Sequence, residues 1–207
     1  MKRIVSLLVA LAGSVAAFAQ TPGEIIARMD EEMDKHQDSG LAMTVDVRLP
    51  ILGSMVTKTW TLGDKICLKA DMYGEEIVTW SDGKTKWTYS SDKNEIEIEN
   101  EDPNHPTESE GDAEMLSGIT EGYDVSIKKE TNDAWYLQCR KSRSNKNKDD
   151  PKSMELVVSK GTYLPLSLSA TLSGVTLTMR DFSFGVTEKQ VTFDRSAYPD
   201  ARIIDRR

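Results

Sequence analysis

The chain has 207 residues, a formal net charge of -8 and 29% charged residues. This acidic balance argues against binding to nucleic acid or to anionic membrane surfaces, because both carry negative charge themselves. The two cysteines are too few for the disulfide framework of a small secreted domain, although a single pair stays open.

The first 19 residues have the parts of a secretory signal peptide. Lys2 and Arg3 precede an apolar run over 4–12, and small residues lead to Ala19. The run is shorter than the roughly 18 apolar residues of a membrane span, and no later stretch reaches that length. Cleavage after Ala19 would release 20–207 as one soluble domain. We expect it to be free in the periplasm, since no cysteine directly follows the cleavage site to carry a lipid.

A helix is predicted at the start of this domain. Thr21 and Glu24 form a capping box, and Pro22 takes the first helical position. Apolar residues then recur at helical spacing and should pack on a sheet: Ile25, Ile26, Met29 and Met33. The pair Ser39-Gly40 is typical of a helix end.

Everything after the helix alternates between apolar and polar residues with the period of β-strands. The first group of predicted strands covers Leu41–Leu49, Val56–Leu62, Lys65–Met72, Glu76–Trp80, Thr85–Tyr89 and Glu95–Glu99. Turn signals such as Gly63-Asp64 and Ser81-Asp82-Gly83 separate them. Their spacing indicates an antiparallel meander.

An acidic stretch over 100–112 interrupts this pattern and leads to a short helical candidate at 113–119. The second group of predicted strands covers Tyr123–Glu130, Trp135–Lys141, Met154–Lys160, Leu164–Leu172, Val175–Phe184 and Gln190–Asp194. About a dozen strands require a sheet that curls into a barrel or splits into a sandwich. The two helices would act as a lid or plug.

The residues give weak support to catalysis or metal binding. His36 and His105 are the only histidines, and neither stands in a motif with a nucleophile or a second ligand. The acidic stretch lacks the alternating ligands of a calcium loop. The basic turn at 140–148 is interpreted as a solvated hairpin, and a docking point for an acidic partner is the alternative. We expect no enzyme activity, no cofactor and no metal.

The cysteines are predicted to lie on different faces. If Ile66 and Leu68 point inward, Cys67 points outward, whereas Cys139 shares a face with Trp135. This mismatch disfavours a disulfide without excluding it.

One segment resembles a known family. The turn Ser81–Thr85 is followed by Trp87 and Tyr89 at alternate positions and by the strand Asn94–Ile98. This pattern is similar to the outer-membrane lipoprotein carriers, the LolA-like proteins, and the order of elements is similar over nearly the whole mature chain. One departure is that residues 62–65 read Leu-Gly-Asp-Lys, where members commonly carry an arginine followed by a proline that latches the lid.

The resemblance implies a mainly β fold with a few α-helices, an unclosed antiparallel half-barrel with a helical lid. It also implies a monomeric periplasmic carrier that takes lipoprotein acyl chains, or another lipid, from an inner-membrane release complex to an outer-membrane receptor. The alternative is a periplasmic sensor or adaptor that binds protein partners through the same half-barrel. A third possibility is an enzyme acting on lipid or glycan through a carboxylate or serine site.

The apolar strand positions exceed what two short helices can cover, so we expect a lipid-binding cavity, although an ordinary core would give the same alternation. The residues predicted to line it are Val45, Val47, Leu49, Trp60, Leu62, Ile66, Leu68, Met72, Trp87, Leu166, Leu168, Leu177 and Met179. Trp87 and Tyr89 are expected to be buried, with Lys86 and Thr88 on the other side of their strand.

Overall fold

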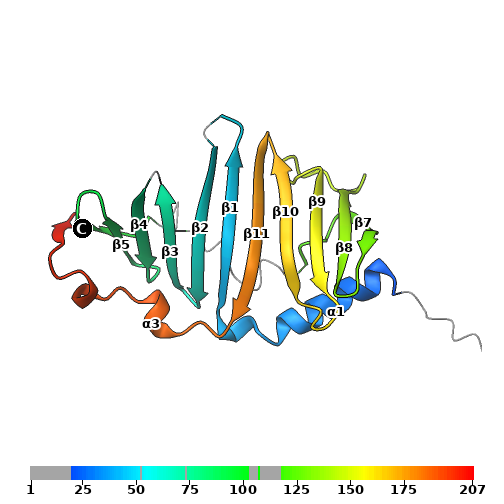
Figure 1. Cartoon of the computed structure of the whole chain (residues 1–207), viewed down its shortest axis with the longest axis horizontal. Helices are drawn as coiled ribbons and strands as arrows, with labels where there is room; N and C mark the ends of the chain where they lie inside the picture. Colours follow the sequence, from blue (N-terminus) through cyan, green and yellow to red (C-terminus); the bar gives the residue numbers. More distant parts are fainter. Residues whose placement is uncertain (1–19, 52, 73, 103–106, 108–117) are drawn as a thin grey trace, which may run out of the picture.

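A computed structural model describes residues 20–51, 53–72, 74–102, 107 and 118–207. These residues form one 12-stranded sheet in the order β12-β6-β5-β4-β3-β2-β1-β11-β10-β9-β8-β7, which is unclosed and antiparallel apart from the β12/β6 pair (Figure 1). The predicted mainly β, unclosed fold with few helices is therefore confirmed. The predicted signal peptide and residues 113–117 of the helical candidate at 113–119 lie outside the described residues.

The chain begins with helix α1 (Pro22–Asp34) and a 3₁₀ turn, η1 (Gln37–Ser39). Both bonds of the predicted capping box are present, because the Glu24 backbone N–H donates to Thr21 Oγ1 and the Thr21 N–H donates to the Glu24 carboxylate. Gly40 then turns into the sheet at φ 68°, where a Cβ would overlap the carbonyl oxygen of Thr61. A glycine is required there because only glycine combines this backbone angle with so close an approach.

Replacing Thr21 with alanine is expected to lower the free energy of unfolding by about 1 kcal/mol, because the first turn of α1 loses its side-chain acceptor. Urea unfolding of the mutant and the wild type would measure the difference. Ser54→Ala serves as a control at an exposed position of the sheet. An equal loss in both mutants would contradict the role of the cap.

The strands agree closely with the predicted alternation, and four have the predicted bounds. The strands before the acidic stretch are β1 (Leu41–Leu49), β2 (Gly53–Leu62), β3 (Lys65–Met72), β4 (Glu75–Ser81), β5 (Thr85–Ser90) and β6 (Glu95–Asn100). Those after it are β7 (Tyr123–Glu130), β8 (Ala134–Lys141), β9 (Ser153–Ser159), β10 (Pro165–Leu172), β11 (Val175–Phe184) and β12 (Arg202–Asp205).

The C-terminal arm, residues 185–207, differs from the prediction. The expected strand Gln190–Asp194 is wrong, because a capping box at Thr187 starts the short helix α3 (Glu188–Val191), followed by the 3₁₀ turn η2 (Arg195–Ala197). The final strand β12 was not predicted. It adds to β6 in parallel, where Arg202 and Arg206 pair with Glu95 and Glu97.

Residues that pair directly across neighbouring strands lie on the same face of a sheet, so the registers show which side chains share a face. On one side, cross-strand partners from β8 to β1 pack with α1: Leu137, Leu156, Leu168, Met179 and Val45. We call this side the α1 face. From α1, Ile25, Met29 and Met33 complete the core on it.

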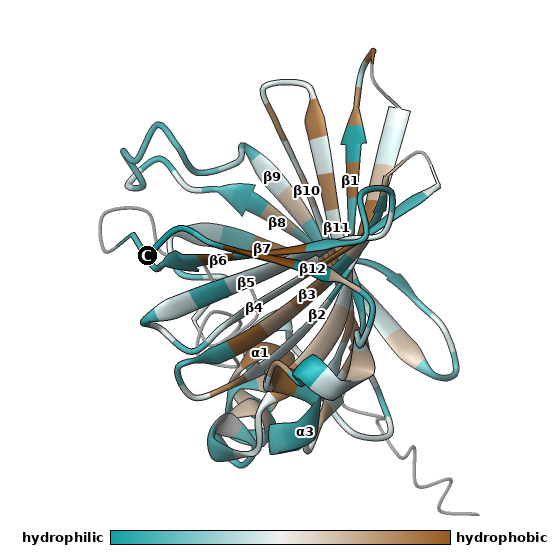
Figure 2. Cartoon of the chain, turned by 90° about the vertical axis from the view of Figure 1, so that its left-hand side faces the viewer, coloured by the Kyte–Doolittle hydropathy of each residue, from teal (hydrophilic) through white to brown (hydrophobic). Residues whose placement is uncertain are grey.

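The second core lies on the opposite side of the same sheet, which we call the arm face. The partners Trp60, Cys67, Trp80 and Trp87 run across β2 to β5 one position out of phase with the α1 face. Phe193 and Tyr198 of the C-terminal arm cover them. Both α1 and α3 lie near the same end of the strands (Figures 1 and 2). The sheet thus buries the α1 face in one half and the arm face in the other.

No helix in the described ranges has the length and apolar character that crossing a membrane requires.

Candidate functional site

The α1 face changes from buried to open along the strands. In β1, Leu41, Met43 and Val45 are buried near α1, whereas Val47 and Leu49 farther along the strand are only half-buried. The same gradient runs along β2, β3, β10 and β11. On β1 and β7–β11 the near end of this face packs with α1, whereas at the far end, on β2 and β3 as well, the apolar side chains stay partly in contact with solvent.

We call this far end the apolar strip. It consists of alternating positions on five neighbouring strands that share the α1 face: Val47, Leu49, Met55, Ala70, Met72, Ala170, Leu172, Val175 and Leu177. Met72 is 39% exposed and Leu172 is 45% exposed. They lie at the hairpins β3–β4 and β10–β11, on the same edge of the molecule as the β1–β2 hairpin (Figure 1). Ile51, in that last hairpin, is 94% exposed.

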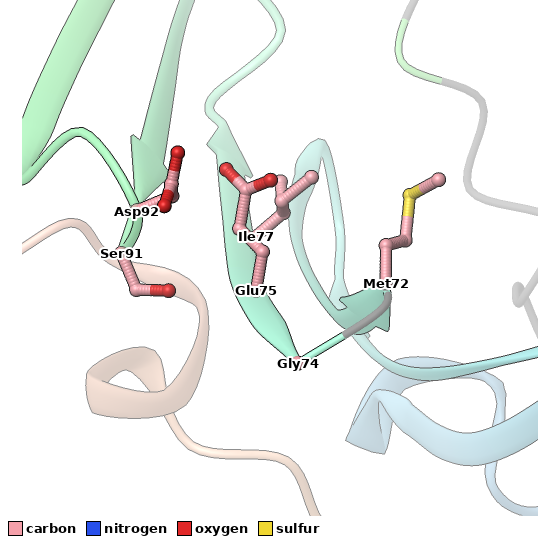
Figure 3. Close-up of a pocket in the computed structure, with 6 residues that line it drawn as sticks. All are labelled: Met72, Gly74, Glu75, Ile77, Ser91 and Asp92. Atoms are coloured by element: carbon pink, nitrogen blue, oxygen red, sulfur yellow. The ribbon is translucent and has the colours of Figure 1, made fainter.

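A cavity of about 550 Å³ adjoins the β3–β4 end of the strip. Figure 3 shows Glu75 and Ile77 between Met72 on one side and Ser91 and Asp92 on the other. Ser90 Oγ donates a 2.6 Å hydrogen bond to Glu75 Oε1. The apolar strip therefore leads into a cavity whose wall combines methionine and isoleucine side chains with carboxylates.

Carboxylates continue along the α1 face toward β6. A second cavity of about 310 Å³ shares Glu75 and Ile77 with the first and extends to Glu95 and Glu97. The Arg202 and Arg206 guanidinium groups pair with Glu95 and Glu97, so much of this negative charge is neutralised. The α1 face is thus apolar in the middle of the sheet and polar around β6, next to the edge strand β12.

The predicted cavity residues do not all share this face. Nine alternate on the α1 face: Val45, Val47, Leu49, Ile66, Leu68, Met72, Leu168, Leu177 and Met179. Of these, Val45, Ile66, Leu168 and Met179 are buried, and the others are half-buried or exposed. The strand registers thus place the residues predicted to line one cavity on two faces of the sheet.

The remaining predicted residues lie elsewhere. Trp60, Leu62 and Trp87 alternate on the arm face, and Leu166 is 47% exposed beside an irregularity in the β9/β10 register. The expected phase of Trp87 and Tyr89 is confirmed, since both contact the arm core and Thr88 has the other phase. They are half-buried, because Phe193 and Tyr198 cover only part of each ring.

A turn in the sequence indicates which side chains of β2 and β3 share a face. The two-residue turn Gly63-Asp64 makes Leu62 and Lys65 partners, so Trp60 must pair with Cys67 and not with Ile66. Hydropathy alternation alone cannot detect this, because a strand with both faces partly apolar fits either phase.

The cysteines are both buried and free. Cys67 lies on the arm face and Cys139 on the α1 face, so the predicted difference in face is confirmed, but Cys67 points into the arm core and not to solvent. Burial raises the pKa of the Cys67 thiol to about 12 and that of Cys139 to about 11. Both thiols are therefore protonated near neutral pH.

His36 stacks on Phe184 with ring centroids 4.4 Å apart, and His105 lies outside the described residues. Within the described part of the chain, no group of three or more histidine, cysteine, aspartate and glutamate side chains has an arrangement that could hold a metal ion.

No protein-family model matches the sequence, and no curated protein matches it. Solved structures with a distantly similar fold include LprF from Mycobacterium bovis, with a TM-score of 0.48 and 9% identity over 82% of this chain and 96% of that one. A LolA superfamily protein from Nitrosomonas europaea has a TM-score of 0.32 and 14% identity over 86% and 100%. MucB in the Pseudomonas aeruginosa MucA/MucB complex has a TM-score of 0.42 and 14% identity over 83% of this chain and 60% of that one.

Proposed function

We propose that this protein is a periplasmic carrier that shields the acyl chains of lipoproteins, or of another lipid, on the apolar strip. The observation that carries the proposal is the run of half-buried and exposed apolar side chains that share one face on five adjacent strands. A contiguous apolar surface of this kind is typical of a binding site, because monomeric proteins seldom leave one exposed without a function.

The sequence supports the location and the cargo. The signal-peptide pattern over 1–19 would export residues 20–207 as one domain. The segment from Ser81 to Ile98 resembles lipoprotein carriers, and such a carrier would exchange cargo with an inner-membrane release complex and an outer-membrane receptor.

An open strip also suits release. A buried methylene contributes about 0.8 kcal/mol, so full burial of a sixteen-carbon chain would contribute about 12 kcal/mol before opposing costs. An acyl chain that lies on half-buried residues such as Val47 and Leu177 keeps part of its own surface in water. It therefore gains less than this limit and can be handed on.

The test replaces Val47, at the centre of the strip, with lysine. The lysine ammonium group must stay hydrated, whereas a bound acyl chain would exclude water from this position. Affinity for a fluorescent fatty acid is therefore expected to fall at least about tenfold. The fold is expected to survive because Val47 is only half-buried. Fluorescence titration would measure the affinity, and thermal unfolding would confirm the fold.

Val56→Lys is the matched control. Val56 lies on the neighbouring strand but faces the other side of the sheet, opposite Asp46, and it is 40% exposed. The control should bind the fatty acid as the wild type does. If Val47→Lys folds and binds equally well, the strip is not the acyl site. Folding failure of Val47→Lys would favour a solid core, and Ala70→Lys then repeats the test at a half-buried strip position on β3.

A sensor or adaptor that binds protein through the same face is the competing function. It is favoured if no lipid copurifies with the protein, as measured by mass spectrometry, and the wild type fails to bind the fatty acid.

A further inference from the structure

A separate cavity of about 340 Å³ lies on the arm face, between the sheet and the C-terminal arm. Its sheet wall is formed by side chains of β2, β3 and β4: Trp60, Cys67, Lys69, Val78 and Trp80. Its other wall is formed by the arm: Lys189, Gln190, Thr192, Asp194, Ala197 and Tyr198. None of these residues belongs to the apolar strip, so the cavity is distinct from the proposed acyl site.

The sheet wall is mainly aromatic and apolar, whereas the arm wall places Tyr198 and Ala197 beside charged and polar side chains. Tyr198 packs edge-on against Trp80 with ring centroids 5.7 Å apart, and Trp60 is the cross-strand partner of Cys67. Val78 and Cys67 are 4% and 5% exposed, so they supply a dry floor between the rings. Burial raises the pKa of the Cys67 thiol to about 12, which leaves it a neutral sulfur able to contact an aromatic ring.

The charges at the mouth are balanced. Lys69 forms an ion pair with Glu76. Hydrogen bonds from Ser196 lower the pKa of Asp194, and the positive charge of Lys189 lowers it further, so this carboxylate is ionised beside an ammonium group. A charged ligand would lose its hydration on entering the cavity. Because the charges there are already paired, no free opposite charge would offset that cost, and binding would be unfavourable.

The volume limits the size of the ligand. A cavity of about 340 Å³ is at the small end of the range for ligand pockets. That is room for a molecule of two or three rings and too little for a lipid with several acyl chains. Flat rings would also make the most contact with Trp60, Trp80 and Tyr198.

We infer that this cavity binds a small uncharged molecule with aromatic or fused rings. The arm therefore contributes half of a second binding site, in addition to covering the arm core. This site is independent of the proposed acyl-chain function, because it uses the other face of the sheet.

The test uses N-phenyl-1-naphthylamine, an uncharged fluorescent molecule with three rings. Ala197 lies exposed at the cavity wall on the arm, so Ala197→Trp fills the space without altering the sheet. Ala27→Trp, at an exposed position of α1, is the matched control. Ala197→Trp is expected to weaken binding of the dye at least about tenfold, and Ala27→Trp to leave it within about twofold of wild type.

The titrations are repeated in the Val47→Lys background, which disables the strip, so that dye bound among acyl-binding residues is not counted. Ala197→Trp should keep its affinity for the fluorescent fatty acid, and Val47→Lys should keep its affinity for the dye. Equal dye binding by Ala197→Trp and Ala27→Trp in that background would overturn the inference, as would the absence of saturable binding. If Ala197→Trp fails to fold, Thr192→Trp fills the same cavity from another position.

Discussion

Replacing Trp80 with alanine is expected to lower the free energy of unfolding by about 3–5 kcal/mol. Trp80 is only 7% exposed, and its ring packs edge-on against Phe193 and Tyr198, with centroids 5.4 Å and 5.7 Å away. The mutation would remove the central aromatic contact between the arm and the sheet, while the pairing of β12 with β6 remains. Urea unfolding followed by circular dichroism would measure the loss.

Trp87→Ala is the control for this effect. Trp87 lies opposite Trp80 on the next strand, but it is half-buried and stacks on Phe193 alone, with centroids 5.6 Å apart. Its loss should be clearly smaller. A double-mutant cycle between Trp80→Ala and Phe193→Ala should give a coupling energy of about 0.5–1.5 kcal/mol. Zero coupling would contradict the packing of the arm on this face.

Replacing Met29 with alanine is expected to lower the free energy of unfolding by about 2–5 kcal/mol. Met29 is 1% exposed and packs with Ile25 and Met33 against the sheet, so its removal leaves a cavity beneath α1. Urea unfolding followed by circular dichroism would again measure the loss. Met72→Ala is the control: this side chain is 39% exposed at the rim of the strip and should change stability by less than about 0.5 kcal/mol.

The two large effects also test the division of the core. Because Met29 and Trp80 lie in cores on opposite faces of the sheet and share no described partner, their effects should add to within about 0.5 kcal/mol. Strong coupling between them would indicate one continuous core. Such a core would leave no reason for α1 and the arm to have separate roles.

The division has a functional consequence. α1 covers the near end of one face and leaves the far end open, while the arm covers the other face with Phe193 and Tyr198. A ligand on the apolar strip therefore need not displace either covering element. In such a carrier, exchange with a donor or acceptor would depend on access to the hairpins that carry Ile51, Met72 and Leu172.

Local interactions made much of the fold predictable. The capping box at Thr21 and the spacing of Ile25, Met29 and Met33 predict α1 and its buried face, because these contacts lie within a few residues. Strict alternation predicts the strands for the same reason. Alternation gave a wrong prediction for the arm, where Gln190–Asp194 has the pattern of a strand. The capping box at Thr187 and the packing of the arm on Trp80 favour a helix and a turn there instead.

The sequence by itself determined that this is a strand-rich protein with one amphipathic helix and a surplus of apolar strand positions, and its resemblance to the lipoprotein carriers implied an unclosed sheet. Only the tertiary structure decided which face each position serves. Trp60 and Val47 have the same alternating pattern, but they lie on opposite faces because the register places Trp60 opposite Cys67 and Val47 opposite Met55. Which face becomes buried depends on elements distant in sequence, α1 for one half and the C-terminal arm for the other, and local periodicity carries no information about such contacts.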